Sequence, residues 1–175
     1  MFKFLDKISS QKSILIIAFK GWSDAAEAAT SAVDTIIKNY DSKKFASFEE
    51  EEFFAFARER PNIKNSKDGR IIEWPNNDLY YIQDAIENTP LIIMNGTEPH
   101  FKWKTFSKEV IDLCLSMNVT SVVTLGALLD SIPHTRGVKT QITGQHEFMP
   151  EGFTQKKIGP SKYEGPTGIT SVIIE

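Results

Sequence analysis

Residues Ser13–Phe19, SILIIAF, form a short β-branched apolar run, and a run of this kind predicts a buried strand at the centre of the fold. It leads directly into Lys20–Asp24, KGWSD, and then into an alanine-rich segment. Asp24 and Glu27 have the spacing of a capping box, which predicts that a helix begins here. The apolar residues of this helix recur at helical spacing: Ala25, Ala28, Ala29, Ala32, Val33, Ile36, Ile37 and Tyr40.

Two further apolar runs follow the same pattern. Leu91–Met94, LIIM, predicts a second buried strand, and Val119–Leu125, VTSVVTL, predicts a third. Between them, a second amphipathic helix is expected after Pro99, with one apolar face: Phe106, Val110, Leu113, Cys114 and Met117. Strand and helix units in this order are typical of an α/β fold, so we expect a mostly parallel sheet covered by helices on both faces.

The segments between these units are less regular. Phe45–Arg60 mixes phenylalanines with acidic residues, and we expect the phenylalanines in the core, the acidic run on a surface turn of helix and Phe54–Arg58 as a strand. Arg70–Trp74 and Leu79–Ile82 are expected to form a short hairpin around residues 75–77. From Gly137 onward glycine and proline become frequent, which predicts a region rich in loops.

The composition excludes several classes of protein. The chain has 175 residues and a net charge of −3, and nucleic-acid binders usually carry a basic excess, so no nucleic-acid partner is expected. It has no apolar run of membrane-spanning length and no signal-peptide pattern, which predicts a cytoplasmic protein without a membrane partner. We expect a single α/β domain over 1–175. The apolar run at 171–175, SVIIE, predicts that this domain is incomplete at its C-terminus.

The common cofactor motifs are absent from the sequence. There is no P-loop, no dinucleotide-binding glycine pattern, no HExxH and no CxxC, so we expect no cofactor and no metal. His100, His134 and His146 do not have the spacing of a helical metal site. The single cysteine, Cys114, falls on an apolar helix face, which favours a buried, inert thiol.

Polar and aromatic side chains gather in the loops that follow the three strands. The carboxyl ends of parallel strands form the ligand-binding edge of an α/β sheet. The residues expected to line this edge are Trp22, Asp24, Glu98, Trp103, His134 and Arg136. A purely structural role is the alternative, in which Asp24 caps a helix, Glu98 pairs with Arg136 and the tryptophans pack.

A serine-hydrolase site is a weaker alternative. Residues 21–25, GWSDA, lie between a strand and a helix like a nucleophile elbow, with Asp130 and His134 following in the order of a catalytic triad. However, Asp24 directly after Ser23 would place a negative charge beside the oxyanion hole. The same carboxylate and Glu27 oppose phosphate binding at this helix start.

Five blocks occur in a fixed order along the chain: GWSDAAEAAT, IIEWPNNDLY, GTEPHFKW, VVTLGALLDSIPHTR and KYEGPTGI. Together they resemble the bacterial branch of the proteasome assembly chaperone 2 family, from about Ile14 to Ile169. Two positions depart from the family pattern, because Ser23 stands where Asn is common and Gly137 where Pro is usual. A nucleophile that is replaced by Asn cannot attack, which weakens the hydrolase hypothesis further.

The resemblance implies a fold similar to the purine nucleoside phosphorylase type and a helix beginning within Thr167–Glu175. It also implies a non-enzymatic protein-binding module, because relatives help to assemble proteasome α rings without ATP. The docking tail of those relatives is not found at the end of this sequence. We therefore expect a homo-oligomer with a protein client such as proteasome subunits, and no catalytic residues. The alternative is a binder or enzyme for a nucleoside- or phosphate-type small molecule that uses the strand-end loops.

Overall fold

The computed structural model describes residues 2–8, 12–48, 51–86, 89–137, 140, 142 and 163–175. The chain forms two compact units, Met1–Leu128 with Thr167–Glu175, and Leu129–Pro166. The described residues of the second unit contain no helix or strand, and most of the predicted loop-rich region lies outside the described residues. The organisation of 1–175 as a single domain stays a prediction.

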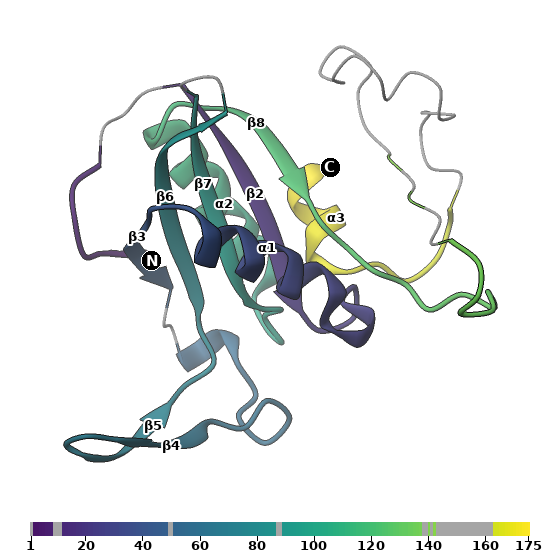
Figure 1. Cartoon of the computed structure of the whole chain (residues 1–175), viewed down its shortest axis with the longest axis horizontal. Coiled ribbons are helices and arrows are strands. Elements are labelled where there is room, and N and C mark those ends of the chain that lie inside the picture. Colours follow the sequence, from purple (N-terminus) through teal and green to yellow (C-terminus); the bar gives the residue numbers. More distant parts are fainter. Residues whose placement is uncertain are drawn as a thin grey trace. The chain divides into compact units, whose positions relative to one another are not determined.

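A six-stranded mixed sheet forms the centre of the larger unit (Figure 1). The strand order across it is β1 (Lys3–Phe4), β3 (Ser42–Phe48), β6 (Asn77–Ile86), β7 (Thr89–Thr97), β2 (Ser13–Lys20) and β8 (Val119–Thr124). Only β7, β2 and β8 run parallel, whereas β1, β3, β6 and β7 pair antiparallel. The expectation of a mostly parallel sheet is therefore wrong. Only two residues separate β6 from β7, and so short a connection permits antiparallel pairing alone.

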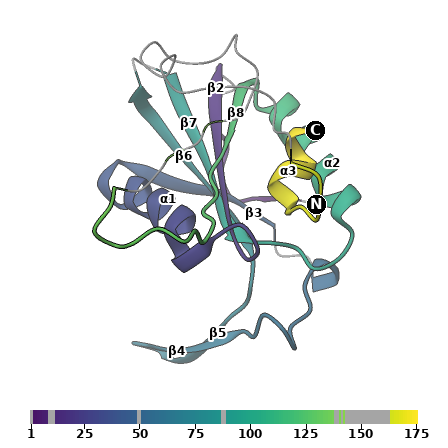
Figure 2. The same ribbon diagram turned by 90° about the vertical axis from the view of Figure 1, so that its right-hand side faces the viewer.

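Alternate residues of β2 contact different helices. One apolar cluster holds Leu15, Ile17 and Phe19 together with α2 (Trp103–Ser116) and α3 (Ile169–Ile174). The other holds Ala18 together with α1 (Ala28–Asn39). Figure 2 shows α1 to one side of the strands and α2 with α3 to the other. The period-two pattern of the strand thus fixes which helix each apolar side chain meets.

Phenylalanines build much of the core beneath α2. Phe48, Phe53 and Phe106 are fully buried and contact one another edge to face, with ring centroids 4.8 to 6.0 Å apart. Tilted and edge-to-face rings are the favoured aromatic geometry. Phe45 and Phe54 are also buried, so the expectation that these phenylalanines form core is confirmed for the four in β3 and the segment after it.

Two predictions for the middle of the chain are wrong. After the short 3-10 helix η2 (Glu51–Phe53), residues 56–58 form a turn rather than a strand, because Arg58 and Glu59 both donate backbone hydrogen bonds to the carbonyl of Ala55. The hairpin forms between β4 (Asn62–Ser66) and β5 (Gly69–Glu73). Its turn is made by Lys67 and Asp68, and Gly69 follows at a φ of +122°. Leu79–Ile82 belongs instead to β6 in the central sheet.

The other predicted elements are present. The strands at Ser13, Leu91 and Val119 and the helix after Pro99 are all formed, although β7 extends well beyond Leu91–Met94 at both ends. The helix expected within Thr167–Glu175 is α3. The first helix begins in two steps, because η1 (Ala25–Glu27) precedes α1, and Ala26 and Glu27 both have φ values of 55°.

Candidate functional site

The residues expected at the strand-end edge fall into both units. Trp22 and Asp24 follow β2, Glu98 follows β7, and Trp103 begins α2, all in the larger unit. His134 and Arg136 belong to the unit Leu129–Pro166. There the backbone N–H of Arg136 closes a turn onto the carbonyl of Pro133 at 2.9 Å.

Glu98 joins three separate segments of the larger unit. Its Oε2 accepts the backbone N–H of Trp22 at 3.1 Å, and its Oε1 accepts the N–H of Ile169 at 2.8 Å. Its own N–H donates to the carbonyl of Lys20 at 2.8 Å. The carboxylate therefore ties the loop after β2 and the start of α3 to the end of β7.

The glycines around Glu98 leave little free space there. Gly21 has a φ of +137°, and a Cβ on it would lie 2.9 Å from both Cβ and Oε2 of Glu98. A Cβ on Gly168 would lie 2.7 Å from Oγ of Ser23 and 3.2 Å from Oε1 of Glu98. Of the predicted strand-end residues, Trp22 and Glu98 thus meet in a closely packed junction, and the carboxylate of Glu98 is already hydrogen-bonded there.

Asp24 has a structural role as well. It is buried, and its Oδ1 accepts the backbone N–H groups of Ala29 at 2.8 Å and Thr30 at 3.2 Å, while the Thr30 hydroxyl donates to Oδ2. These are N–H groups of the first turn of α1, which have no partner within the helix. Asp24 thus caps the helix, as expected, but through Ala29 and Thr30 rather than through a capping box with Glu27.

The aromatic side chains near this junction differ in exposure. Trp103 packs against the core, and its Nε1 donates to the carbonyl of Pro99 at 2.6 Å. The Nδ1 of His100 accepts the backbone N–H of Ala55 at 3.3 Å. Trp22 is 66% exposed, with its ring edge beside Gly168. Of the predicted residues in this unit, only Trp22 offers a large free surface.

No assembled catalytic group exists among the described residues of the larger unit. The carboxylates of Asp24 and Glu98 both accept backbone N–H groups, and Ser23 lies against Gly168. Among the described residues no cluster of His, Cys, Asp or Glu is placed to hold a metal ion, and His146 lies outside them. Burial raises the pKa of the Cys114 thiol to about 11, so it is protonated and unreactive at neutral pH.

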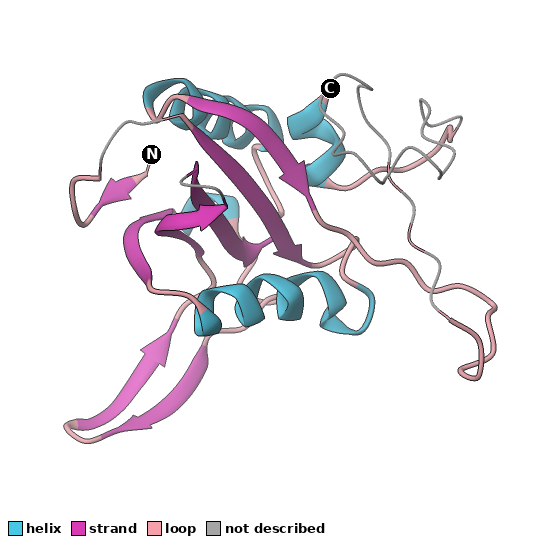
Figure 3. Cartoon of the chain, turned by 45° about the horizontal axis from the view of Figure 1, so that its top comes forward, coloured by secondary structure: helices cyan, strands magenta, loops and turns pink. Residues whose placement is uncertain are grey.

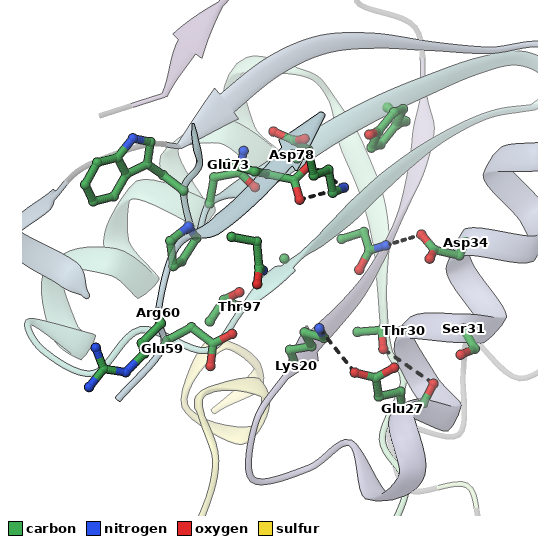
Figure 4. Close-up of a pocket in the computed structure, with 18 residues that line it drawn as sticks. Lys20, Glu27, Thr30, Ser31, Asp34, Glu59, Arg60, Glu73, Asp78 and Thr97 are labelled. Carbon is green, nitrogen blue, oxygen red and sulfur yellow. Dashed lines mark hydrogen bonds and ion pairs between the residues drawn. The ribbon is translucent and has the colours of Figure 1, made fainter. Parts of the chain in front are cut away.

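A polar groove of about 440 Å³ lies beside the junction and was not predicted (Figure 4). One wall is α1, with Thr30, Ser31 and Asp34, and the floor is formed by the ends of β2, β6 and β7. The base of the β4–β5 hairpin and the segment that follows it form the other wall. Lys20 and Thr97 lie at the ends of β2 and β7, where the sequence predicted a ligand-binding edge. The wall formed by the hairpin was not predicted, because Arg70–Trp74 was expected to pair with Leu79–Ile82.

The groove carries an excess of negative charge. Five carboxylates line it, against the three cationic side chains of Lys20, Arg60 and Lys64. Lys20 pairs with Glu27 at 3.2 Å and Lys64 with Glu73 at 2.7 Å, while Asn95 donates to Asp34 at 2.5 Å. Asp78 pairs with Lys44 at 2.7 Å. The groove is therefore better suited to positive than to negative groups.

Two pKa shifts show the effect of this charge. The pKa of Lys20 is raised, first by its hydrogen bond to Glu27 and then by the charges of Glu27, Glu59 and Asp24. The pKa of Tyr80 is raised by burial and by the neighbouring charges of Asp78 and Asp34. Both shifts favour the more positive form of the group.

Among the described residues of the larger unit, the β4–β5 hairpin and the residue that follows it carry four exposed apolar side chains. Ile63 is 60% exposed and lies opposite Ile72, which is 57% exposed. Ile71 and Trp74 are about half exposed, and the Trp74 ring lies 4.9 Å from that of Phe56. Exposed clusters of this kind commonly mark protein interaction sites. We call Ile63, Ile71, Ile72 and Trp74 the hairpin surface.

Comparison with known proteins gives a consistent result. A model of the PAC2 family matches residues 18–175. A PAC2 family protein from Streptomyces avermitilis is 30% identical with a TM-score of 0.79, and the match covers 93% of this chain and 68% of that one. A proteasome-assembly chaperone homologue from Mycobacterium tuberculosis is 30% identical with a TM-score of 0.77, covering 91% of this chain and 67% of that one.

More distant structures share the fold alone. PbaB, an archaeal proteasome activator from Pyrococcus furiosus, is 15% identical with a TM-score of 0.69, and the match covers 99% of this chain and 72% of PbaB. Among proteins with curated descriptions, none matches this sequence. In the described part of the chain, no helix has both the length and the apolar character needed to cross a bilayer.

Proposed function

Because the chain belongs to the PAC2 family, we propose that it is a non-enzymatic, protein-binding module with a chaperone-like role. In this proposal it acts in the cytoplasm, associates with itself and binds a protein client. The relative from Mycobacterium tuberculosis is named as a proteasome-assembly chaperone homologue, which supports proteasome subunits as the first client to test.

The observation that carries this proposal is the hairpin surface. Its four apolar side chains are each more than half exposed, and three of them lie on a two-stranded hairpin. Two strands alone bury too little apolar area to be stable in water, so a covering partner would stabilise them. Tryptophan is enriched in protein interfaces and among their most energetically important residues.

The test is native mass spectrometry of the N-terminally tagged chain, purified from the cell that produces it. We expect a stoichiometric protein partner to purify with the wild type and to be lost in Ile72→Asp. The control is Ile111→Asp, which changes an exposed isoleucine of α2 and should keep the partner. A wild type without any bound protein would contradict the proposal. So would turnover of a small substrate that is lost in Glu98→Gln or His134→Ala.

A small-molecule site is the second candidate, and the polar groove favours it. The expected similarity to purine nucleoside phosphorylases suggests a nucleoside- or phosphate-type ligand, and the groove volume is within the range of about 300–1,000 Å³ typical of ligand pockets. Its negative charge favours a neutral nucleoside over free phosphate. Thermal unfolding with adenosine, inorganic phosphate or spermidine tests this, since any ligand that binds the folded chain raises its Tm.

A further inference from the structure

The β4–β5 hairpin lies uncovered within the described part of the larger unit. Every residue of β4 and β5 is exposed, and Figure 3 shows the hairpin extending away from the central sheet. Its apolar residues occur on both of its faces, because Ile63 and Ile72 form one cross-strand pair while Ile71 faces the other way, opposite Lys64. Two strands alone bury too little apolar area to be stable in water, so a partner that contacts both faces of the hairpin would stabilise it.

The exposed end of the hairpin is basic. Lys64 is paired with Glu73 near its base. Lys67 and Arg70 lie at the turn with one acidic residue, Asp68. The partner surface should therefore be concave, polar and negatively charged.

The polar groove meets these requirements. It has about 440 Å³ of space, enough to admit long side chains, and carboxylates outnumber cations along its walls. The raised pKa of Lys20 shows that Glu27 and Glu59 favour a positive charge there. The base of the hairpin forms one wall of the groove in its own chain, and the turn of that hairpin points away from the groove. A hairpin turn that enters the groove must therefore belong to another molecule.

We propose that the β4–β5 hairpin of one copy docks into the polar groove of a second copy, and that the contact is reciprocal. This rests on the proposed function, because it identifies the surface through which the module associates with itself. Lys67 and Arg70 approach Glu27 and Glu59 of the other copy. A two-fold arrangement satisfies both hairpins and both grooves at once and closes as a dimer.

A charge-exchange experiment tests this contact. One variant reverses the hairpin charges, Lys67→Glu with Arg70→Glu, and a second reverses the groove charges, Glu27→Lys with Glu59→Lys. All four side chains lie at the surface or are only partly buried, so both variants should fold, which thermal unfolding checks. The matched control reverses two exposed charges of α2, Lys104→Glu with Lys108→Glu. Dimer dissociation constants are measured by sedimentation equilibrium.

We expect each reversed variant alone to associate at least about tenfold more weakly than the wild type and the control, since like charges then meet. An equimolar mixture of the two variants should recover dimers that contain one copy of each. The wild-type dimer should weaken as salt is added. A monomeric wild type, variants that associate as strongly as the wild type, or a mixture that does not recover would overturn the proposal. Binding of a client by a monomer would overturn it while leaving the proposed client binding intact.

Discussion

Glu98 holds Ile169 in place: its Oε1 accepts the backbone N–H of Ile169 at 2.8 Å, across 71 positions of sequence. Through this bond a residue that looks like a catalytic acid fixes the first turn of α3. The second carboxylate oxygen of Glu98, Oε2, accepts the backbone N–H of Trp22. The carboxylate of Glu98 therefore connects the loop after β2 and the start of α3 to the end of β7.

Glu98→Gln should destabilise the larger unit, and α3 first. Glutamine offers one acceptor oxygen, so one of the two backbone N–H groups would face an amide donor, at a cost of about 1–3 kcal/mol. Hydrogen exchange should show faster exchange of the Ile169 N–H and of the rest of α3. Glu109→Gln on α2 is the matched control. Unchanged protection of α3 in Glu98→Gln would show that this carboxylate does not hold the helix.

Gly96→Ala should be strongly destabilising. A Cβ at this position would lie 1.8 Å from Oδ1 and 2.7 Å from Cα of Asn77, which is fully buried, so the two strands must separate at a cost of about 2 kcal/mol or more. Urea denaturation measures the loss. Gly126→Ala is the control, because its Cβ would approach other atoms only to 3.4 Å. Adding Asn77→Ala should restore only part of the stability. It removes the clash with the Asn77 side chain, but the clash with Cα of residue 77 remains.

Asp24→Ala should shorten α1 at its beginning. It removes the acceptor for the N–H groups of Ala29 and Thr30, and loss of such a cap costs about 1–2 kcal/mol. Thermal unfolding measures the change. Asp41→Ala, an exposed aspartate beyond the end of the helix, serves for comparison and should have little effect. Equal losses in the two variants would contradict the capping role.

Cys114 should resist thiol reagents in the folded protein. Burial raises its pKa from 9.0 to about 11, so almost no thiolate is present at pH 8. An exposed cysteine introduced by Leu115→Cys in a Cys114→Ser background should react rapidly, because Leu115 is 76% exposed. Rapid labelling of Cys114 without unfolding would refute this burial.

The same shift predicts how stability depends on pH. The folded state keeps its thiol proton to a higher pH than the unfolded state, so the contribution of Cys114 is fully present below pH 9. It should be lost as the pH rises from 9 towards 11. Comparison of the wild type with Cys114→Ser in urea denaturation across this window checks the sign. A difference in the free energy of unfolding between the two proteins that does not change with pH would contradict this prediction.

Long apolar runs made part of the fold predictable. β2, β8 and α2 were found because a buried strand or an amphipathic helix leaves a clear local pattern. The pairing of β6 with β3 and β7 was missed because Leu79–Ile82 was joined to the wrong partner. The Asp68-Gly69 dipeptide, a strong hairpin signal, lies at the observed turn, one position beyond its centre.

The site was less predictable than the fold. The sequence placed Trp22, Asp24 and Glu98 near one edge, but their partners are set by contacts between distant segments, such as Trp22 with Glu98 over 76 positions. A local pattern cannot show whether a carboxylate faces a ligand or a backbone N–H. The groove depends on a hairpin whose position follows from the folded chain alone.

Photo-cross-linking in the producing cell shows whether the hairpin surface contacts another protein. A photoreactive amino acid is placed at Ile72 in one variant and at Leu115 in another, both of which are exposed positions. We expect a discrete adduct with a second copy or another protein from position 72 and none from position 115. No adduct from position 72, or equal adducts from both positions, would contradict it.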